Sequence, residues 1–393
     1  MPVDLQSLTP TQLRARGTIK WNLYPADVLP LWVAEMDYPT APPVLAAIRE
    51  AVDVESFGYP LDAQQSELAE ETAAWLARER PGAAPWTVDP RGIFSTGDVM
   101  RGVDLALRTL VDRTAPVIIT TPVYMPFFDA VPLAGLRHVE VPMMRAEGRH
   151  DGRWTFDLDG IERAFADGAR TLLLCSPYNP LGLVFTRAEL LALADIVARY
   201  RGRVISDEIH APLVLSGEHV PYASLTPETA RHTVTMVAAS KAWNLPGLKC
   251  AQLVASNDAD VDVLRRLPHL ATTGVSTLGT VASIAAYREG GPWLEQVLAL
   301  LDHHADRVAE AVSGMPGVRH TRNEGTYLAW LDCSELGLDV EPADWFREQA
   351  RVALSDGRPF GAPEHRYARL NFATTTAILD EALERMSAAL RSR

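Results

Sequence analysis

The middle of the sequence alternates short apolar, β-branched runs with amphipathic stretches, and this alternation constrains the fold more than any other feature. Helical periodicity separates the runs at 158–166 and 188–200. Strands that alternate with helices form a mostly parallel sheet covered by helices, so α/β architecture is expected. The strand-like runs are residues 93–96, 116–121, 137–142, 171–175, 203–206 and 233–239.

The pattern changes after about residue 284, which predicts a second domain of α+β type. A long helical stretch at 293–315 is followed by a short hairpin-like region at 327–331, and a closing helix is expected at about 377–391. The predicted organisation is a large domain at 51–284, a small C-terminal domain at 285–393, and an N-terminal arm with part of the small domain at 1–50.

Within residues 1–80 the sequence predicts an arm followed by one strand and two helices. Residues 1–30 are expected to be extended with a few turns. The apolar run 32–37 is interpreted as a strand that ends before Pro39. Helices are predicted from Pro43 to about Val52 and at 66–80.

Charge and cysteine content narrow the classes of function. The formal net charge of the 393 residues is −13, which argues against nucleic-acid and anionic-membrane partners because phosphate contacts need clustered Lys and Arg. No apolar run reaches the ~18 residues of a membrane span, and the N-terminus lacks a secretory pattern. Cys175, Cys250 and Cys333 are far apart, with no metal-like or disulfide spacing. A cytoplasmic protein without a metal site is expected.

An acid and a lysine follow two of the predicted strands. Asp207 comes at the exit of the strand 203–206, and Lys241 follows the apolar run 233–239. Because ligands bind outside the carboxyl ends of strands in such sheets, both side chains are expected to face one ligand. Pyridoxal 5′-phosphate (PLP) needs this pair: a lysine for the imine and a carboxylate that keeps the ring nitrogen protonated. Taken singly, Lys241 could be a solvated loop end and Asp207 a helix cap.

Four further features are candidates, and each also has an ordinary structural explanation. Asn179 lies in the turn-forming Ser-Pro-Tyr-Asn-Pro-Leu-Gly sequence, and Gly97-Asp98-Val99 opens a helix whose N–H groups could bind a phosphate. Tyr124 follows a strand and could stack on a ring or belong to the core. Arg369 could grip a substrate carboxylate or lie at the surface.

Taken together, these residues resemble the fold-type I PLP enzymes of the aspartate aminotransferase superfamily. The family order is a glycine turn, a ring-stacking aromatic residue, Asn-Pro-x-Gly, Asp-x-x-Tyr/His, Ser-Lys and a late Arg, and it is present from about residue 20 to the C-terminus. The resemblance implies a large domain with a mostly parallel seven-stranded sheet and a smaller α+β domain. It also implies a homodimer whose subunits share active sites.

Within the superfamily, the chain looks most like the MalY/PatB branch of cystathionine β-lyase-type C–S lyases. His210 stands where most aminotransferases have a tyrosine, and enzymes of that branch also have a histidine at this position. Some positions depart from the branch pattern, among them Tyr178, Phe185 and Asp98, whose negative charge lies beside the predicted phosphate loop. The branch-like segments are 31–37, 57–59, 206–210, 241–248, 276–279 and 325–332.

The resemblance implies a role for each candidate. Lys241 would form the imine with PLP and move the α-proton, Asp207 would pair with the pyridine nitrogen, and Tyr124 would stack on the ring. Arg369 would bind the substrate carboxylate, beside Ala34 and Tyr59, and Tyr59 would reach in from the second subunit. The remaining cofactor contacts would come from Gly97, Asp98, Val99, Asn179, His210, Ser240 and Lys249.

Three functions remain open at the level of sequence. The favoured one is α,β-elimination of a cysteine S-conjugate, a small amino-acid substrate, to a thiol, pyruvate and ammonia. A class I/II aminotransferase would use the same residues, with reprotonation on the cofactor in place of elimination. A regulatory PLP-binding protein is the third reading, although the intact set of Lys241, Asp207 and Asn179 argues against lost chemistry.

Overall fold

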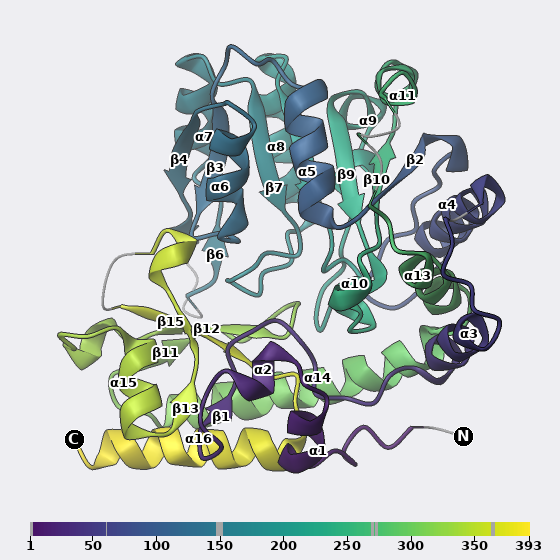
Figure 1. Cartoon of the computed structure of the whole chain (residues 1–393). Helices are drawn as coiled ribbons and strands as arrows, with labels where there is room; N and C mark the ends of the chain where they lie inside the picture. The colour runs from purple at the N-terminus through teal and green to yellow at the C-terminus, as the bar shows by residue number, and fades with distance from the viewer. Residues whose placement is uncertain (1–2, 60, 147–151, 269–270, 272–273, 363–365) are drawn as a thin grey trace.

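The structure is a computed structural model that describes residues 3–59, 61–146, 152–268, 271, 274–362 and 366–393. Figure 1 shows a large sheet with its helices in the upper part of the view and a smaller group of strands below it, with two long helices, α14 (Gly291–Ser313) and α16 (Thr376–Arg391), at the base. The buried apolar side chains form two main clusters, one around the large sheet and one around the smaller part.

The large sheet has the expected seven strands. Their order is β2-β10-β9-β8-β7-β3-β4. Neighbouring strands from β9 to β4 are parallel, whereas β10 is antiparallel to both β2 and β9. The expected mostly parallel sheet is therefore confirmed. Its strands are β2 (Ile93–Thr96), β3 (Val117–Thr121), β4 (His138–Pro142), β7 (Thr171–Cys175), β8 (Arg203–Asp207), β9 (Thr233–Val237) and β10 (Ala251–Ala255).

The register of three parallel strands aligns their carboxyl ends. Cys175 at the end of β7 pairs with Asp207 at the end of β8, and Asp207 pairs with Met236 near the end of β9. The chain leaves all three strands at the same edge of the sheet. Loops that follow them therefore meet there, which is where ligands bind in open α/β sheets.

Helices form close to where the periodicity predicts them. The prediction at 66–80 is displaced, because α4 begins at Asp62 and Arg78 already has extended backbone geometry. Around the large sheet and the N-terminal half, the helices include α3 (Pro42–Asp53), α4 (Asp62–Ala77), α5 (Val99–Thr109), α6 (Pro126–Leu133), α7 (Leu158–Ala166), α8 (Arg187–Arg199), α9 (Pro227–His232), α11 (Asp258–Arg265) and α13 (Thr277–Glu289).

The smaller part contains a four-stranded antiparallel sheet in the order β11-β12-β15-β14. Its strands are β11 (Arg319–His320), β12 (Leu328–Asp332), β14 (Ser355–Asp356) and β15 (Tyr367–Asn371). The predicted domain limits at 50 and 284 stay a prediction. No described helix has the length and apolar character that a membrane crossing requires.

The N-terminal arm is more structured than predicted and is attached to the smaller part. Strand β1 (Leu29–Pro30) pairs in parallel with β13 (Val352–Ala353). Residues 1–30 also contain two short helices, α1 (Pro10–Ala15) and α2 (Ile19–Asn22), so the expectation of an extended arm is wrong. A capping box explains α1, because the Gln12 amide N donates to Thr9 Oγ1 and the Thr9 amide N donates to Gln12 Oε1.

The predicted strand at 32–37 is also wrong. Side chains, and not a neighbouring strand, bind most of the carbonyl oxygens of this segment. Asn371 Nδ2 donates to the carbonyl oxygens of Val33 (2.6 Å) and Glu35 (2.7 Å). Asn244 both donates to the carbonyl of Met36 and accepts from its N–H, each at 2.8 Å. Residues 32–35 are half-buried, and only Met36 and Asp37 are fully buried. Backbone groups that leave water need hydrogen-bond partners, but these need not come from a neighbouring strand, and here amide side chains provide several of them.

A buried ion pair holds the end of this segment. Lys20 Nζ lies 2.8 Å from Asp37 Oδ2 and 2.9 Å from the carbonyl oxygen of Glu35. Trp21 Nε1 donates to Asp37 Oδ1 at 2.7 Å, and all three side chains are almost completely buried. Removing one partner of a buried pair leaves an uncompensated charge, which is strongly destabilising.

We expect Asp37→Asn to lower the free energy of unfolding by about 3–5 kcal/mol, because the Lys20 ammonium loses its counter-charge inside the protein. The measurement is the urea midpoint and slope, followed by circular dichroism. Asp27→Asn is the control, since it removes an exposed ion pair with Arg351 and should change stability little. Equal effects of the two substitutions would show that burial of the Lys20–Asp37 pair is unimportant.

Candidate active site

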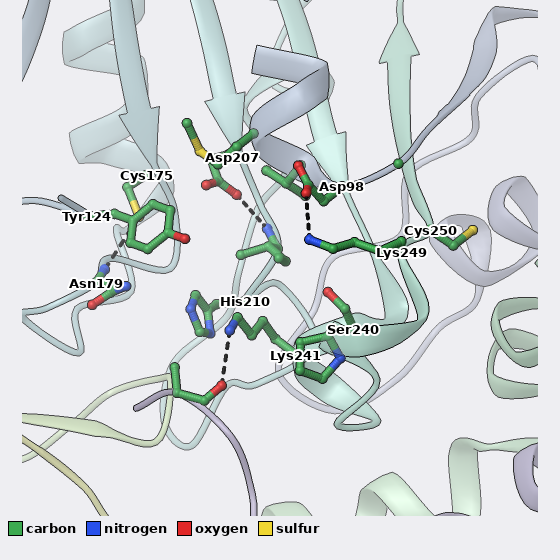
Figure 2. Close-up of a pocket in the computed structure, with 16 residues that line it drawn as sticks. Asp98, Tyr124, Cys175, Asn179, Asp207, His210, Ser240, Lys241, Lys249 and Cys250 are labelled. Atoms are coloured by element: carbon green, nitrogen blue, oxygen red, sulfur yellow. Dashed lines mark hydrogen bonds and ion pairs between the residues drawn. The ribbon is translucent and has the colours of Figure 1, made fainter. Parts of the chain in front are cut away.

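A pocket of about 170 Å³ lies at the carboxyl edge of the large sheet, where the loops after β2, β7, β8 and β9 meet (Figure 2). Most of the residues singled out in the sequence line it. Arg369 lies behind the lining, and Tyr59 is elsewhere on the chain. The predicted residues that line the pocket are Ala34, Gly97, Asp98, Val99, Tyr124, Asn179, Asp207, His210, Ser240, Lys241 and Lys249.

Lys241 enters the pocket from α10 (Ala239–Ala242), the short helix after β9. Its Nζ donates a hydrogen bond to the carbonyl oxygen of Ala34 at 3.0 Å (Figure 2). Burial, assisted by the positive charge of Arg369, lowers the pKa of the Lys241 ammonium to about 8. The amine is therefore easier to deprotonate than an ordinary lysine, as a nucleophile or base requires.

Asp207 ends β8 and is 2% exposed. Its Oδ1 accepts a hydrogen bond from the Ile209 N–H at 3.1 Å, and no described Lys, Arg or His lies within ion-pair distance of it. Burial raises the pKa of this carboxyl to about 7, although the hydrogen bond from Ile209 and the charge of Lys241 oppose the rise. A carboxylate buried in this way is costly unless a cation accompanies it.

Arg369 on β15 is a buried cation with no carboxylate partner among the described residues. Its Nη1 donates to Asn179 Oδ1 at 2.9 Å, and its Nη2 donates to the carbonyl oxygen of Trp32 and to Ser355 Oγ, both at 3.2 Å. Burial lowers the pKa of the guanidinium to about 10. Neutral acceptors therefore orient the arginine without cancelling its charge, and Asn179 connects it to the pocket.

One end of the pocket is built around the N-terminus of α5. Asp98 caps this helix, with Oδ1 accepting from the Arg101 N–H at 2.9 Å, while Oδ2 pairs with Lys249 Nζ at 3.0 Å (Figure 2). A side chain at Gly97 would clash, because a Cβ there would lie 2.8 Å from the carbonyl oxygen of Gly274. Helix N–H groups and a lysine thus come together, as an anion site requires. The negative charge of Asp98 is engaged by the cap and by Lys249.

Two ring side chains complete the predicted set. Burial, with the nearby Asp207 charge, raises the pKa of the Tyr124 hydroxyl to about 12, so the ring stays neutral. Burial lowers the pKa of His210 well below its ordinary value, so the imidazole is neutral too. His210 Nδ1 is buried and has no hydrogen-bond partner among the described residues.

Tyr59 is not part of this chain's pocket. It lies between α3 and α4, and its side chain is completely exposed. The predicted contact from a second subunit needs a second chain, so the role of Tyr59 stays a prediction.

Sequence reasoning missed five lining residues: Met100, Cys175, Ile209, Pro246 and Cys250. Cys175 and Ile209 had a readable signal, because each lies at or just after the end of a strand that was predicted. Cys250 had none, since its position depends on the turn after Lys249. The described residues contain no group of three or more His, Cys, Asp or Glu side chains that could hold a metal ion.

Glu208, directly after Asp207, is buried but does not line this pocket. Its carboxylate accepts hydrogen bonds from Ser206 Oγ at 2.8 Å and from the Tyr222 N–H at 3.1 Å, and its other oxygen lies 3.0 Å from His219 Nε2. Its acceptors are therefore well supplied with partners, in contrast to those of Asp207. Of the two adjacent carboxylates, only Asp207 is available to a ligand.

Comparisons with known proteins agree with this geometry. The family model for aminotransferase class I and II matches residues 26–386. A putative cystathionine β-lyase of Mycobacterium tuberculosis is 41% identical over the whole of both chains. The cystathionine β-lyase of Corynebacterium glutamicum is 39% identical, with 96% of this chain and 98% of that protein covered.

Solved structures give the same result. The crystal structure of a putative PLP-dependent β-cystathionase from Corynebacterium diphtheriae superposes with a TM-score of 0.92 and 39% identity, covering 99% of each chain. PatB and MalY are also matched, which confirms the branch that the sequence resembles. The chain therefore belongs to the aminotransferase class I and II family.

Proposed function

We propose that the chain is a PLP-dependent carbon–sulfur β-lyase, which cleaves a cysteine S-conjugate by α,β-elimination to a thiol, pyruvate and ammonia. The observation that carries the proposal is one pocket that joins the Lys241 amine to the Asp207 carboxylate, with the Arg369 cation behind its lining, and within the described part of the chain neither the charge of Asp207 nor that of Arg369 has an ion-pair partner. The named relatives support elimination over amino transfer, because those of highest identity are cystathionine β-lyases.

The pocket fits PLP on the chemistry of its donors and acceptors. Asp207 is a buried carboxylate to which no described residue supplies a cation, and a protonated pyridine nitrogen would provide one. The helix N-terminus at Asp98–Val99, with Ser240 and Lys249, would hold the phosphate. Tyr124 would stack on the ring, and Asn179 and His210 would face its oxygen side. These assignments are part of the proposal.

When bound, PLP supplies an electron sink for the charge that develops at Cα of the substrate. Arg369 binds the substrate carboxylate and thereby orients the Cα–H bond toward the lysine. The Lys241 amine takes the Cα proton, which its lowered pKa permits near neutral pH. The Asp207 carboxylate stabilises positive charge at the deep end of the pocket. The sulfur then leaves Cβ as a thiolate.

Wild-type enzyme loaded with PLP should release pyruvate from L-cystathionine without any keto acid, and Lys241→Ala should lower the rate at least about 10³-fold, because the base is lost. The measurement is a coupled pyruvate assay. Arg91→Ala is the control, because it removes an exposed ion pair with Asp89 outside the pocket, and it should retain turnover. A strict requirement for a keto-acid acceptor would identify an aminotransferase instead.

The raised pKa of Asp207 leads to a second prediction, which concerns how the stability of the apoenzyme depends on pH. The folded-state pKa of about 7 lies above the ordinary value of 3.8, so the folded protein holds a proton between these pH values that the unfolded chain has released. The stability contribution is present below about pH 4 and is lost as pH rises through about 7. Over this pH range, the free energy of unfolding of wild-type apoenzyme should fall by at most about 4 kcal/mol relative to that of Asp207→Asn.

Denaturant unfolding of both apoproteins between pH 4 and 7.5 measures this difference. PLP should restore the lost stability of the wild type, because the pyridinium gives Asp207 its missing partner. Parallel stability curves for wild type and Asp207→Asn would show that the carboxylate is not buried unpaired.

We further propose that the enzyme is a homodimer with shared active sites. Fully exposed Tyr59 belongs to a set of exposed apolar side chains at the end of α3 and between α3 and α4, which is unusual for a surface that stays in water. A partner surface would bury this set and bring Tyr59 to the partner's pocket. The exposed members of the set are Val52, Val54, Phe57, Tyr59 and Leu61.

A subunit-mixing experiment tests this arrangement. Tyr59→Ala and Lys241→Ala homodimers should both be weakly active, whereas hybrids contain one complete site, with Lys241 from one chain and Tyr59 from the other. After random reassociation about a quarter of wild-type activity should return, since half of the dimers are hybrids with one working site. Absence of recovery in verified hybrids would place Tyr59 in its own chain's site or in neither.

We also propose a cytoplasmic location. Cys175, Cys250 and Cys333 are all buried free thiols. Burial raises the pKa of each thiol, which keeps it protonated and unreactive. Free thiols of this kind are compatible with a reducing compartment.

A further inference from the structure

The carbonyl oxygen of Ala34 accepts hydrogen bonds from two side chains. One donor is Lys241 Nζ and the other is the hydroxyl of Tyr327, each at 3.0 Å. The two donors come from different parts of the molecule, since Lys241 follows β9 of the large sheet and Tyr327 precedes β12 of the small sheet. A single backbone oxygen thus connects the lysine with a tyrosine that the proposed function has not used.

Tyr327 is fixed more firmly than a packed ring alone requires. The residue before it, Thr326, has φ = 63°, a conformation that β-branched residues avoid. Hydrogen bonds hold it there: its N–H donates to the carbonyl oxygen of Leu213 at 2.8 Å, and its Oγ1 accepts from the Leu328 N–H at 3.2 Å. Strain maintained in this way is typical of functional positions.

The surroundings of Tyr327 keep its hydroxyl a donor. The side chain is completely buried and its ring meets that of His210 edge-on, with centroids 6.0 Å apart. Burial raises the pKa of the hydroxyl, so it stays protonated. The only acceptor that the described residues give this hydroxyl is the carbonyl oxygen of Ala34.

The acceptor is fixed as well. Asn371 Nδ2 binds the carbonyl oxygens on both sides of Ala34, those of Val33 and Glu35. Because these neighbours cannot rotate freely, the Ala34 peptide has a defined direction. Its oxygen points to the place where Lys241 Nζ ends, which is inside the pocket.

We propose that Tyr327, acting through the Ala34 carbonyl, is a positioning residue for the Lys241 amine. The inference rests on the proposed function, because it concerns the same lysine. A neutral amine has two N–H donors and one lone pair. When the amine donates one N–H to a fixed oxygen, its lone pair can point in fewer directions. Loss of the Tyr327 hydroxyl removes the second donor to the Ala34 carbonyl oxygen, so this acceptor is held less firmly. Tyr327 itself does not line the pocket.

Tyr327→Phe removes the hydroxyl and keeps the ring. Tyr222→Phe is the matched control, because Tyr222 is equally buried and its hydroxyl makes one hydrogen bond, to His232 Nε2 at 3.2 Å, away from the pocket. Thermal unfolding of each variant measures its structural cost, which should be similar for the two.

The first readout uses apoenzyme and does not depend on turnover. The Lys241 lone pair attacks the aldehyde carbon of added PLP, and a C=N bond forms with loss of one water, which changes the visible absorbance. We expect this step to be about tenfold slower in Tyr327→Phe, the effect of one hydrogen bond on a positioned group, and unchanged in Tyr222→Phe. Binding of 4′-deoxypyridoxine 5′-phosphate, which has no aldehyde, should stay within about twofold in both variants.

The second readout is turnover of the loaded enzyme. Tyr327→Phe should lower kcat about tenfold and leave KM within about twofold, because the lysine acts on bound substrate. The proposal would be overturned if Tyr327→Phe and Tyr222→Phe captured PLP covalently at the same rate. It would also be overturned if Tyr327→Phe lost only thermal stability. If capture slows but no variant or wild type yields pyruvate, the positioning role stands and the lyase function fails.

Discussion

The structure depends on how the backbone of residues 32–37 is held. This segment has no β ladder, and its carbonyl oxygens and the Met36 N–H are bound by side chains from separate regions of the chain. Asn244 comes from the loop after Lys241, and Asn371 comes from the strand that carries Arg369. The segment therefore fixes the distance between the lysine and the arginine. The buried Lys20–Asp37 pair anchors its end.

The site is assembled at a cost in stability. Among the residues that the structure describes, the buried Asp207 carboxylate has no cation partner and the buried Arg369 guanidinium has no anion partner. Each would be stabilised by a ligand group of opposite charge, which is the expected signature of a preformed binding site. The neighbouring Glu208 shows the alternative, since its carboxylate is surrounded by donors and gains nothing from a ligand. Asp207 is the last residue of β8 and lines the pocket, whereas Glu208 follows the strand and is bound by Ser206, His219 and Tyr222.

Much of the fold could be predicted from the sequence. The strands that contain residues 171–175 and 203–206 were found to within one residue, because these apolar runs have the length of a strand and lie between helical stretches. The candidate residues Lys241, Asp207 and Asn179 were identified from their positions at strand ends and from the order of family motifs, and the family resemblance is confirmed. The errors fell at 1–30 and 32–37, where short-range capping and side-chain hydrogen bonds replace regular periodicity.

The sequence by itself determined the α/β architecture, the edge of the sheet where ligands bind, and the residue types available there. Local periodicity and turn chemistry encode these features, because they depend on neighbours within a few residues. Only the tertiary structure decided that Asn179 holds Arg369, that Lys249 faces Asp98, and that Tyr327 shares the Ala34 carbonyl with Lys241. These contacts join residues 151 to 293 positions apart in the chain, and no local pattern specifies a contact across such a separation.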